Sequence, residues 1–166
     1  MYQIPRGTRD FLPEQAERFR RLEAAAVRLA SQYGYGEMRT PIFEYSELFE
    51  RSVGESTDIV EKEMYTFQDR GERSLTLRPE GTAGVVRAFI EHKLYNGPLP
   101  AKYFYFGPMF RYEKPQAGRY RQLWQFGVEL LGADGPRADV EVISLGWQYY
   151  QELGVEATLV LNSIGC

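Results

Sequence analysis

The residues whose types and spacing could do chemistry form an alternating row within the segment Gly107–Leu131. In a β-strand, successive side chains point to opposite faces, so every second residue shares a face. Guanidinium, amide and carboxylate groups beside a glycine gap could form the floor of a pocket for a charged small molecule. A half-solvated antiparallel sheet is the alternative explanation, because such sheets commonly have one polar face. The row consists of Arg121, Leu123, Gln125, Gly127 and Glu129, and the apolar face opposite consists of Trp124, Phe126, Val128 and Leu130.

A basic loop precedes this strand and is expected to join it to the strand before. Between Arg111 and Arg121 the loop carries Lys114 and Arg119 but a single acid, Glu113. The planar guanidinium matches phosphate oxygens, and a fixed positive charge can stabilise the charge that develops during phosphoryl or nucleotidyl transfer. The pattern indicates a loop that closes over a phosphate, and an exposed basic hairpin tip is the alternative. The sequence contains no Walker loop, no G-x-G-x-x-G motif and no nucleophile elbow.

The segment RPEGTAG, residues 78–84, passes from a predicted strand into a predicted helix. Side chains at such a turn often reach a ligand, and the first backbone N–H groups of a helix are free to bind one. Glu80 and Thr82 are therefore candidate ligand-binding residues. A glutamate at a helix start also serves as a cap or a favourable charge, and this segment by itself favours that structural role.

Hydrophobic periodicity predicts the helices and strands that must hold these residues. Their order predicts an α+β fold with a mainly antiparallel sheet flanked by helices, rather than a regular alternation of strands and helices. Pro41 cannot donate a hydrogen bond to a sheet, so we expect it at an edge, a bulge or a contact between chains. The predicted helices are 13–33, 46–53, 82 to about 95 and 139–153, and the predicted strands are 37–45, 64–67, 74–78, 101–106, two within 107–131, and 157–161.

Length and composition are typical of one globular domain. The 166 residues are 43% apolar, enough for a sizeable core. A net charge of −3 argues against nucleic-acid binding over the whole surface, although it allows a local basic patch. One cysteine, Cys166, and one histidine, His92, make no internal disulfide and no cluster with zinc-ligand spacing, so no metal site is predicted. Without a signal-like start or a long apolar run, the chain is predicted to be cytoplasmic, with no membrane segment.

Several segments together resemble class II aminoacyl-tRNA synthetases, and specifically the histidyl-tRNA synthetase family. IPRGTRDFLP resembles the N-terminal signature of this family, and GYGEMRTPIFE resembles class II motif 1, with Pro41 as its characteristic proline. VEKEMYTFQDRG, SLTLRPEGTAG and GPMFRYEKPQAGRYRQLWQFGVELLG resemble the histidine-family substrate loop and motif 2. The resemblance covers nearly the whole chain. It implies that residues 1–166 are part of a class II catalytic domain, with motif 3 and the anticodon-binding domain beyond them.

The resemblance also implies roles for individual residues in the activation of histidine by ATP. Arg111 would hold the α-phosphate of ATP and the carboxylate of histidine while the adenylate forms. Glu80, Thr82 and Gln125 would bind the α-amino group of histidine, and Glu129 would face its imidazole ring.

Further residues would contact ATP and the tRNA acceptor end. One of them, Leu123, stands where the family often has a phenylalanine that stacks on adenine, and a leucine can still pack there. The residues given this role are Arg111, Glu113, Arg119, Arg121 and Leu123.

The implied function is that of a histidine–tRNA ligase, which activates histidine with ATP and transfers it to tRNA-His. Magnesium would accompany ATP, but the sequence assigns no protein ligand to it. We expect a homodimer through motif 1, around Pro41, and weak or no activity from these 166 residues alone. Two alternatives stay open. One is a non-catalytic, histidine-binding regulatory subunit of ATP phosphoribosyltransferase, and the other is a nucleic-acid-binding or dimerisation module without a pocket.

Overall fold

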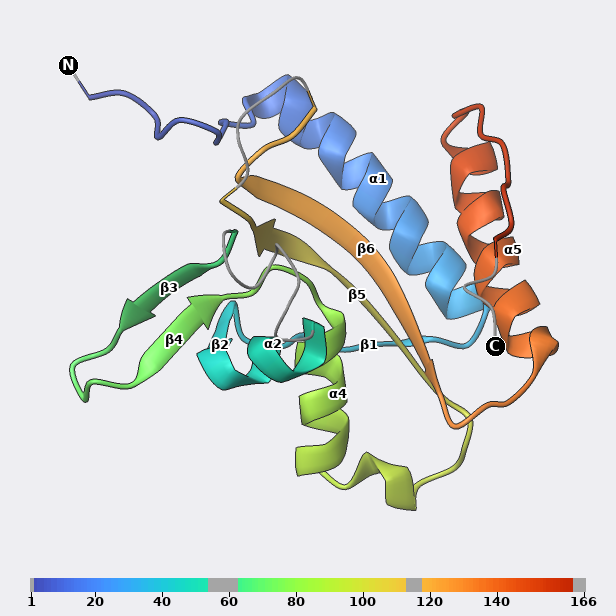
Figure 1. Ribbon diagram of the computed structural model, residues 1–166. Helices are drawn as coiled ribbons and strands as arrows, with labels where there is room; N and C mark the ends of the chain where they lie inside the picture. Colours follow the sequence, from blue (N-terminus) through green and yellow to red (C-terminus); the bar gives the residue numbers. More distant parts are fainter. Residues whose placement is uncertain (1, 54–62, 113–117, 163–166) are drawn as a thin grey trace.

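Two three-stranded sheets organise the part of the protein that the structure describes (Figure 1). The computed structural model describes residues 2–53, 63–112 and 118–162. The first sheet, of order β1-β5-β6, consists of β1 (Gly36–Glu37), β5 (Ala101–Phe110) and β6 (Gln122–Leu131). The second, of order β2-β4-β3, consists of β2 (Phe43–Tyr45), β3 (Tyr65–Gln68) and β4 (Ser74–Leu77). The helices in these ranges are α1 (Pro13–Gln32), α2 (Ser46–Val53), α4 (Thr82–Glu91), the short 3₁₀ helix η1 (Leu94–Asn96) and α5 (Pro136–Glu152).

Most strand pairings in the described part of the chain are antiparallel. The pairs β2–β4, β3–β4 and β5–β6 are antiparallel, and β1 alone runs parallel to its neighbour, β5. The predicted α+β fold with mainly antiparallel pairing is therefore confirmed. The strands divide between two sheets, which periodicity along the chain does not reveal.

One face of the β5–β6 pair forms the main core. Phe104 of β5 packs with Ala30 of α1 and Leu145 of α5, and all three are buried. Phe126 and Val128 of β6 lie partly buried against this cluster. Figure 1 shows α1 and α5 beside this pair, on the side away from α4. The apolar side predicted from alternation in β6 is therefore the core side.

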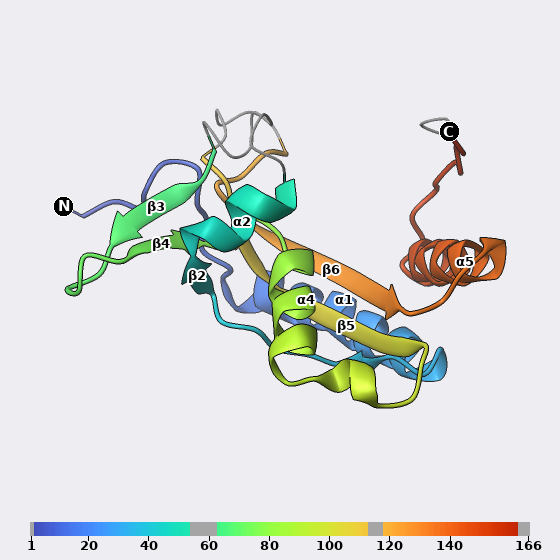
Figure 2. The ribbon, with the colours of Figure 1, turned by 60° about the horizontal axis from the view of Figure 1, so that its bottom comes forward.

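The opposite face of β5 and β6 is turned toward α4. Figure 2 shows α4 in front of the two strands and α1 behind them. Val85 of α4 packs against Tyr105 and Met109 of β5. Because side chains alternate along a strand, Gln125 and Glu129 belong to this face, in the layer between the sheet and α4. The predicted polar row therefore faces an inner layer of the molecule.

The second sheet has one hydroxyl-rich face and one apolar face. Thr76 is fully buried, and its Oγ1 shares hydrogen bonds with Ser46 Oγ at 2.8 Å and with Thr66 Oγ1 at 2.9 Å. The opposite face carries two cross-strand rows of apolar side chains. We call it the aromatic face, and it consists of Phe43, Tyr45, Tyr65, Phe67, Leu75 and Leu77.

The single strand expected at 37–45 is wrong. β1 and β2 are separate strands and belong to different sheets. Pro41 lies between them, and the carbonyls of Thr40 and Pro41 accept hydrogen bonds from the guanidinium of Arg78. Because proline cannot donate to a ladder, the chain leaves the first sheet before Pro41 and enters the second sheet after it.

Two helix boundaries also differ from the prediction. The helix expected to reach about residue 95 ends at Glu91, because Lys93 adopts a left-handed conformation with φ of 53° before η1 begins. Helix α5 begins at Pro136 rather than at residue 139, since proline suits the first turn of a helix. The predicted hairpin around residues 69–71 is present, with β3 shifted by one residue.

The strand predicted at 157–161 is wrong as well. The structure assigns no strand to these residues, and none of the described strands pairs with them. Leu159 instead lies in a shallow groove with Ile143 and Trp147 of α5. An apolar segment forms a strand only where a neighbouring strand can pair with it. The segment 157–161 comes directly after α5, and no described strand pairs with it (Figure 1). None of the described helices is both long and apolar enough to cross a membrane.

Candidate functional site

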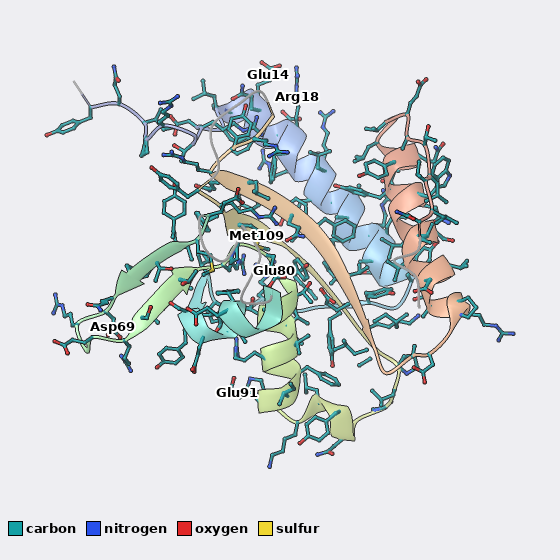
Figure 3. All side chains as sticks on the ribbon, in the orientation of Figure 1. Glu14, Arg18, Asp69, Glu80, Glu91 and Met109 are labelled. Carbon is teal, nitrogen blue, oxygen red and sulfur yellow. The ribbon has the colours of Figure 1, made fainter. Side chains whose placement is uncertain are left out.

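The turn between β4 and α4 positions Glu80 and Thr82. One carboxylate oxygen of Glu80 accepts a hydrogen bond from the backbone N–H of Thr82 at 2.5 Å, and the other accepts one from Ala83 at 3.0 Å. These N–H groups have no partner within the helix, and a negative charge at a helix start is favourable. Glu80 therefore caps α4, which is the structural role that the sequence favours. Figure 3 labels it at the end of α4 nearest Met109.

Tyr105 of β5 fills the space beside this turn, between two glycines. A Cβ atom added to Gly81 would lie 2.3 Å from Cε2 of the Tyr105 ring. A Cβ atom added to Gly127 would also lie 2.3 Å from the ring, at Cζ. The sequence gives no sign of this role, because the alternation in AKYFYF shows that Tyr103 and Tyr105 share a face but not what lies opposite. The pairing register places Tyr105 opposite Gly127.

Thr82, Tyr105 and Glu129 form one hydrogen-bonded cluster. The hydroxyl of Thr82 donates to Oε1 of Glu129 over 2.7 Å, and the hydroxyl of Tyr105 hydrogen-bonds within the same cluster. Burial raises the pKa of Glu129, and the charge of Glu80 adds to this effect, whereas the hydrogen bonds from Thr82 and Tyr105 lower it. Burial also raises the pKa of Tyr105 to about 12, so its hydroxyl remains a donor at neutral pH. The cluster holds a half-buried carboxylate that can accept a hydrogen bond from a ligand N–H.

Arg111 directly follows β5 and reaches back to the same turn. Its Nε donates a hydrogen bond to the carbonyl of Pro79 at 2.9 Å. Its backbone N–H donates to the carbonyl of Arg121, also at 2.9 Å. The guanidinium of Arg111 therefore lies beside the residues that lead into Glu80 and Thr82. A planar group with five N–H donors in this position suits a phosphate or a carboxylate.

Arg78 is a second residue that sequence reasoning did not find. Its Nε donates to the carbonyl of Pro108 at 3.0 Å, and its Nη1 donates to the carbonyl of Thr40 at 3.0 Å. Its backbone N–H donates to Ile42, and its own carbonyl accepts from Phe110, both at 2.9 Å. Burial lowers the pKa of the Arg78 guanidinium. Arg78 thus connects the two sheets through hydrogen bonds. In the sequence, the one feature that could have indicated this role is the position of an arginine at the end of an apolar strand.

Gln125 lies on the face of Glu129 and opposite Gly107 of β5. Its side-chain oxygen is buried and accepts no hydrogen bond from any residue in the described ranges. A buried acceptor without a partner costs about 1–3 kcal/mol. A ligand that brings an N–H group would satisfy this oxygen, so Gln125 is suited to bind one.

The remaining candidate residues lie toward the hairpin loop. Glu113 is outside the described residues. Arg119 is exposed, and Arg121 lies one residue before β6, with its guanidinium 4.0 Å from the centre of the Tyr112 ring. Leu123 packs, partly buried, in the apolar cluster beside α4. The structure therefore brings together Glu80, Thr82, Gln125 and Glu129, with Arg111 at their edge.

No metal centre is visible in residues 2–53, 63–112 and 118–162. No group of three or more acidic, histidine or cysteine side chains there is close enough to hold an ion. His92 follows the last residue of α4, and its backbone N–H closes the helix on Ala88 at 3.0 Å. The backbone of His92 thus contributes to the C-terminal end of α4.

Comparison with known families gives a match over almost the whole chain. A family model described as histidyl-tRNA synthetase matches residues 7–165. The histidine–tRNA ligase of Anoxybacillus flavithermus (strain DSM 21510 / WK1) is 60% identical over 166 residues, which cover 99% of this chain and 39% of that relative. The chain therefore spans about 39% of the length of the curated relatives that it matches.

Two solved structures share the fold. The apo histidyl-tRNA synthetase of S. aureus has a TM-score of 0.78 and 48% identity, over 93% of this chain and 35% of that one. A protein from Bacillus halodurans C, described as an ATP phosphoribosyltransferase regulatory subunit/histidyl-tRNA synthetase, has a TM-score of 0.80 and 28% identity, over 94% of this chain and 39% of that one. Both matches place the two sheets and their helices within the class II core fold.

Proposed function

Because this chain belongs to the histidyl-tRNA synthetase family, we propose that the whole protein is a cytoplasmic histidine–tRNA ligase and that these 166 residues supply one wall of its active site. In the first step, a carboxylate oxygen of histidine attacks the α-phosphorus of ATP, and pyrophosphate leaves. In the second step, a hydroxyl of the terminal ribose of tRNA-His attacks the carbonyl carbon of histidyl-adenylate, and AMP leaves. The chain covers only part of its relatives, so the activity is assigned to the whole protein.

The observation that carries the proposal is the Thr82–Tyr105–Glu129 cluster. A half-buried carboxylate held by two hydroxyl donors is suited to accept an imidazole N–H, and a charge-assisted hydrogen bond of this kind discriminates against side chains without such a donor. The cluster lies beside Glu80, and Gln125, whose side-chain oxygen has no hydrogen-bond partner among the described residues, belongs to the same sheet face. We assign the α-amino group of histidine to Glu80, Thr82 and Gln125.

Arg111 is assigned to the reacting groups themselves. Its guanidinium can bridge the α-phosphate of ATP and the carboxylate of histidine, and it can stabilise negative charge on the phosphate oxygens as the bond forms. Its hydrogen bond to Pro79 supports this assignment, because it fixes the arginine beside the histidine-binding turn. Magnesium accompanies ATP as part of that substrate. The other contacts with ATP and the acceptor end are assigned to Glu113, Arg119, Arg121 and Leu123.

We also propose that the protein is a homodimer that uses the aromatic face and the Pro41 segment beside it. Phe43, Tyr45 and Phe67 are 52%, 48% and 43% exposed, although they lie together on one sheet face. Ile42, next to Pro41, is 45% exposed. Large apolar patches of this kind are typical of surfaces that bind another protein. A second copy of the same chain presents a matching patch in a two-fold dimer.

A regulatory subunit of ATP phosphoribosyltransferase is the less supported alternative. The Bacillus halodurans C structure favours it through the shared fold, but at 28% identity. The curated histidine–tRNA ligase is 60% identical. A regulatory subunit would also have no need for the arginines around the hairpin loop, whereas a ligase needs them to bind ATP and tRNA.

Histidine-dependent exchange of pyrophosphate into ATP tests the proposal. The whole gene product that contains this chain should catalyse the exchange, and the 166 residues alone should show little or none. Arg111→Lys keeps the charge but loses the planar fork, so the exchange rate should fall by about 10²- to 10³-fold. Arg18→Lys, at an exposed pair with Glu14 on α1, is the matched control and should keep the rate. Histidine binding without any exchange in the whole gene product would contradict the ligase and support the regulatory subunit.

A further inference from the structure

The N-terminal segment before α1 forms a closed turn. The backbone N–H and the hydroxyl of Thr8 both donate to the carbonyl of Pro5, at 3.1 and 2.7 Å. Gly7, inside this turn, has a φ of 85°, in the left-handed region that glycine adopts without strain. The turn corresponds to the PRGT part of the N-terminal signature, to which the proposed function assigns no role.

This turn is attached to the base of the β5–β6 hairpin loop. The backbone N–H of Arg121 donates to the carbonyl of Gly7 at 2.7 Å, and Nη1 of Arg121 donates to the carbonyl of Arg6 at 3.4 Å. The contact is close, because a Cβ atom at Gly7 would lie 2.7 Å from Cγ of Arg121. Gly7 is therefore required both for its backbone conformation and for its lack of a side chain.

The other backbone group of Arg121, its carbonyl, connects this residue to Arg111. The carbonyl of Arg121 accepts a hydrogen bond from the backbone N–H of Arg111 at 2.9 Å. Gly7, Arg121 and Arg111 are thus joined in series by two backbone hydrogen bonds. Two ring contacts support the same region: the Arg121 guanidinium lies over Tyr112, and the Arg9 guanidinium lies over Tyr120, 4.7 Å from its centre.

We propose that Gly7 is a positioning residue for Arg111. The inference rests on the proposed function, in which Arg111 holds the α-phosphate of ATP. Gly7 acts through Arg121: its carbonyl holds the backbone N–H of Arg121, and the carbonyl of Arg121 holds the backbone N–H of Arg111, just after β5. A side chain at position 7 displaces Arg121 and shifts the guanidinium of Arg111 from the phosphate. A misplacement of about 1 Å at a reacting group can cost about 100-fold in rate.

The test compares Gly7→Ala with Gly34→Ala in the whole gene product. Gly34 has a φ of 81°, so alanine there causes similar backbone strain, but its Cβ would have no atom within 4 Å. Gly7→Ala should lower kcat/KM for ATP in the exchange reaction by about tenfold or more, and the dissociation constant for histidine alone should change by less than about twofold. Gly34→Ala should leave both values near those of the wild type. The proposal would be overturned if both variants lost the same factor in kcat/KM for ATP. It would also be overturned if Gly7→Ala weakened histidine binding by as large a factor as it lowered kcat/KM for ATP.

Hydrogen exchange separates this proposal from the proposed function, because it needs no activity. In Gly7→Ala the amides of Arg121 and Arg111 should exchange faster, and in Gly34→Ala they should not. Unchanged protection of both amides in Gly7→Ala would overturn the positioning role even if the enzyme were a ligase. If Gly7→Ala does not fold, Thr8→Val provides the second variant, since it removes only the hydroxyl bond to Pro5. In Thr8→Val the amides of Arg121 and Arg111 should also exchange faster than in the wild type, by a smaller factor than in Gly7→Ala. Exchange rates equal to those of the wild type would count against the proposal.

Discussion

The hydroxyl of Thr82 donates a hydrogen bond of 2.7 Å to Oε1 of Glu129. These residues are 47 positions apart and come from the first turn of α4 and from β6. With Tyr105, this bond holds the carboxylate of Glu129 in one orientation, and a fixed acceptor binds a ligand donor at lower entropic cost. Thr82 therefore has a role besides its proposed contact with the α-amino group of histidine. It also orients Glu129, the residue assigned to the imidazole ring.

Replacement of Glu129 by glutamine should weaken histidine binding selectively. The amide keeps an oxygen for the hydroxyl of Thr82 but loses the negative charge, and a hydrogen bond to a charged group contributes about 1.5–3 kcal/mol. We expect the KM for histidine to rise by about 10- to 100-fold in the exchange reaction, with little change for ATP. Glu91→Gln, at an exposed ion pair with Arg87 at the other end of α4, is the control. Unchanged histidine binding in Glu129→Gln would favour a module without a pocket.

Stability should depend on pH through the same carboxylate. Burial holds the pKa of Glu129 above its usual value of 4.5 in the folded protein, whereas the unfolded chain titrates near that value. Between the pKa of Glu129 in the unfolded chain and its higher pKa in the folded protein, the folded state holds more protons than the unfolded state. The contribution of Glu129 to the free energy of unfolding therefore decreases as the pH rises through this interval. Glu129→Gln cannot titrate, so the difference in Tm between this variant and the wild type should shift in favour of the variant as the pH rises above about 4.5. Thermal unfolding across this range checks the prediction, and parallel Tm curves for the two proteins would contradict it.

Alanine at position 127 should destabilise the protein through Tyr105. The new Cβ would lie 2.3 Å from Cζ of the ring, so either the ring or β6 must move. We expect a loss of about 1–3 kcal/mol in the free energy of unfolding, measured with urea. Gly146→Ala on α5 is the matched control, because its Cβ would meet nothing within 4 Å and alanine favours a helix. In the double variant with Tyr105→Ala the two losses should not add, and strict additivity would show that Tyr105 is not the cause.

A charge on the aromatic face should separate the proposed dimer. The rings of Phe43 and Phe67 come from the two outer strands of this sheet and lie 6.5 Å apart, centre to centre. Phe43→Glu and Phe67→Glu should each shift the whole gene product toward the monomer in sedimentation experiments, because an unpaired buried charge is costly. Trp147→Glu changes a comparably exposed aromatic residue on α5 and should leave the mass unchanged. A monomeric wild type, or a dimer that survives both changes, would contradict this interface.

Local patterns in the sequence were sufficient for most elements and for part of the site. The periodicity of α1 and the alternation of β6 depend on neighbours within one element, and both agree with the structure. The alternation also places Gln125 and Glu129 on one face. Arg121 lies outside β6, because the hairpin opens one residue earlier than alternation suggests.

Contacts between distant segments were not predictable in the same way. Tyr105 belongs to the site because the β5–β6 register sets it opposite Gly127 and because Gly81, the N-cap residue of α4, leaves room for its ring. Arg78 joins the two sheets because the chain crosses between them at Pro41. The apolar segment 157–161 has the composition of a strand, but it pairs with none of the described strands, and only Leu159 lines a groove with residues of α5.

The sequence by itself determined the family, the order of most elements and the identity of the polar residues around Glu129. These follow from residue types at fixed spacing, which the chain carries in any conformation. Tertiary structure alone decided that Thr82 and Tyr105 hold Glu129, and that Gly7 supports Arg111 through Arg121. The physical reason is that such contacts depend on strand register and on the close approach of backbones, and both are set only when distant parts of the chain pack together.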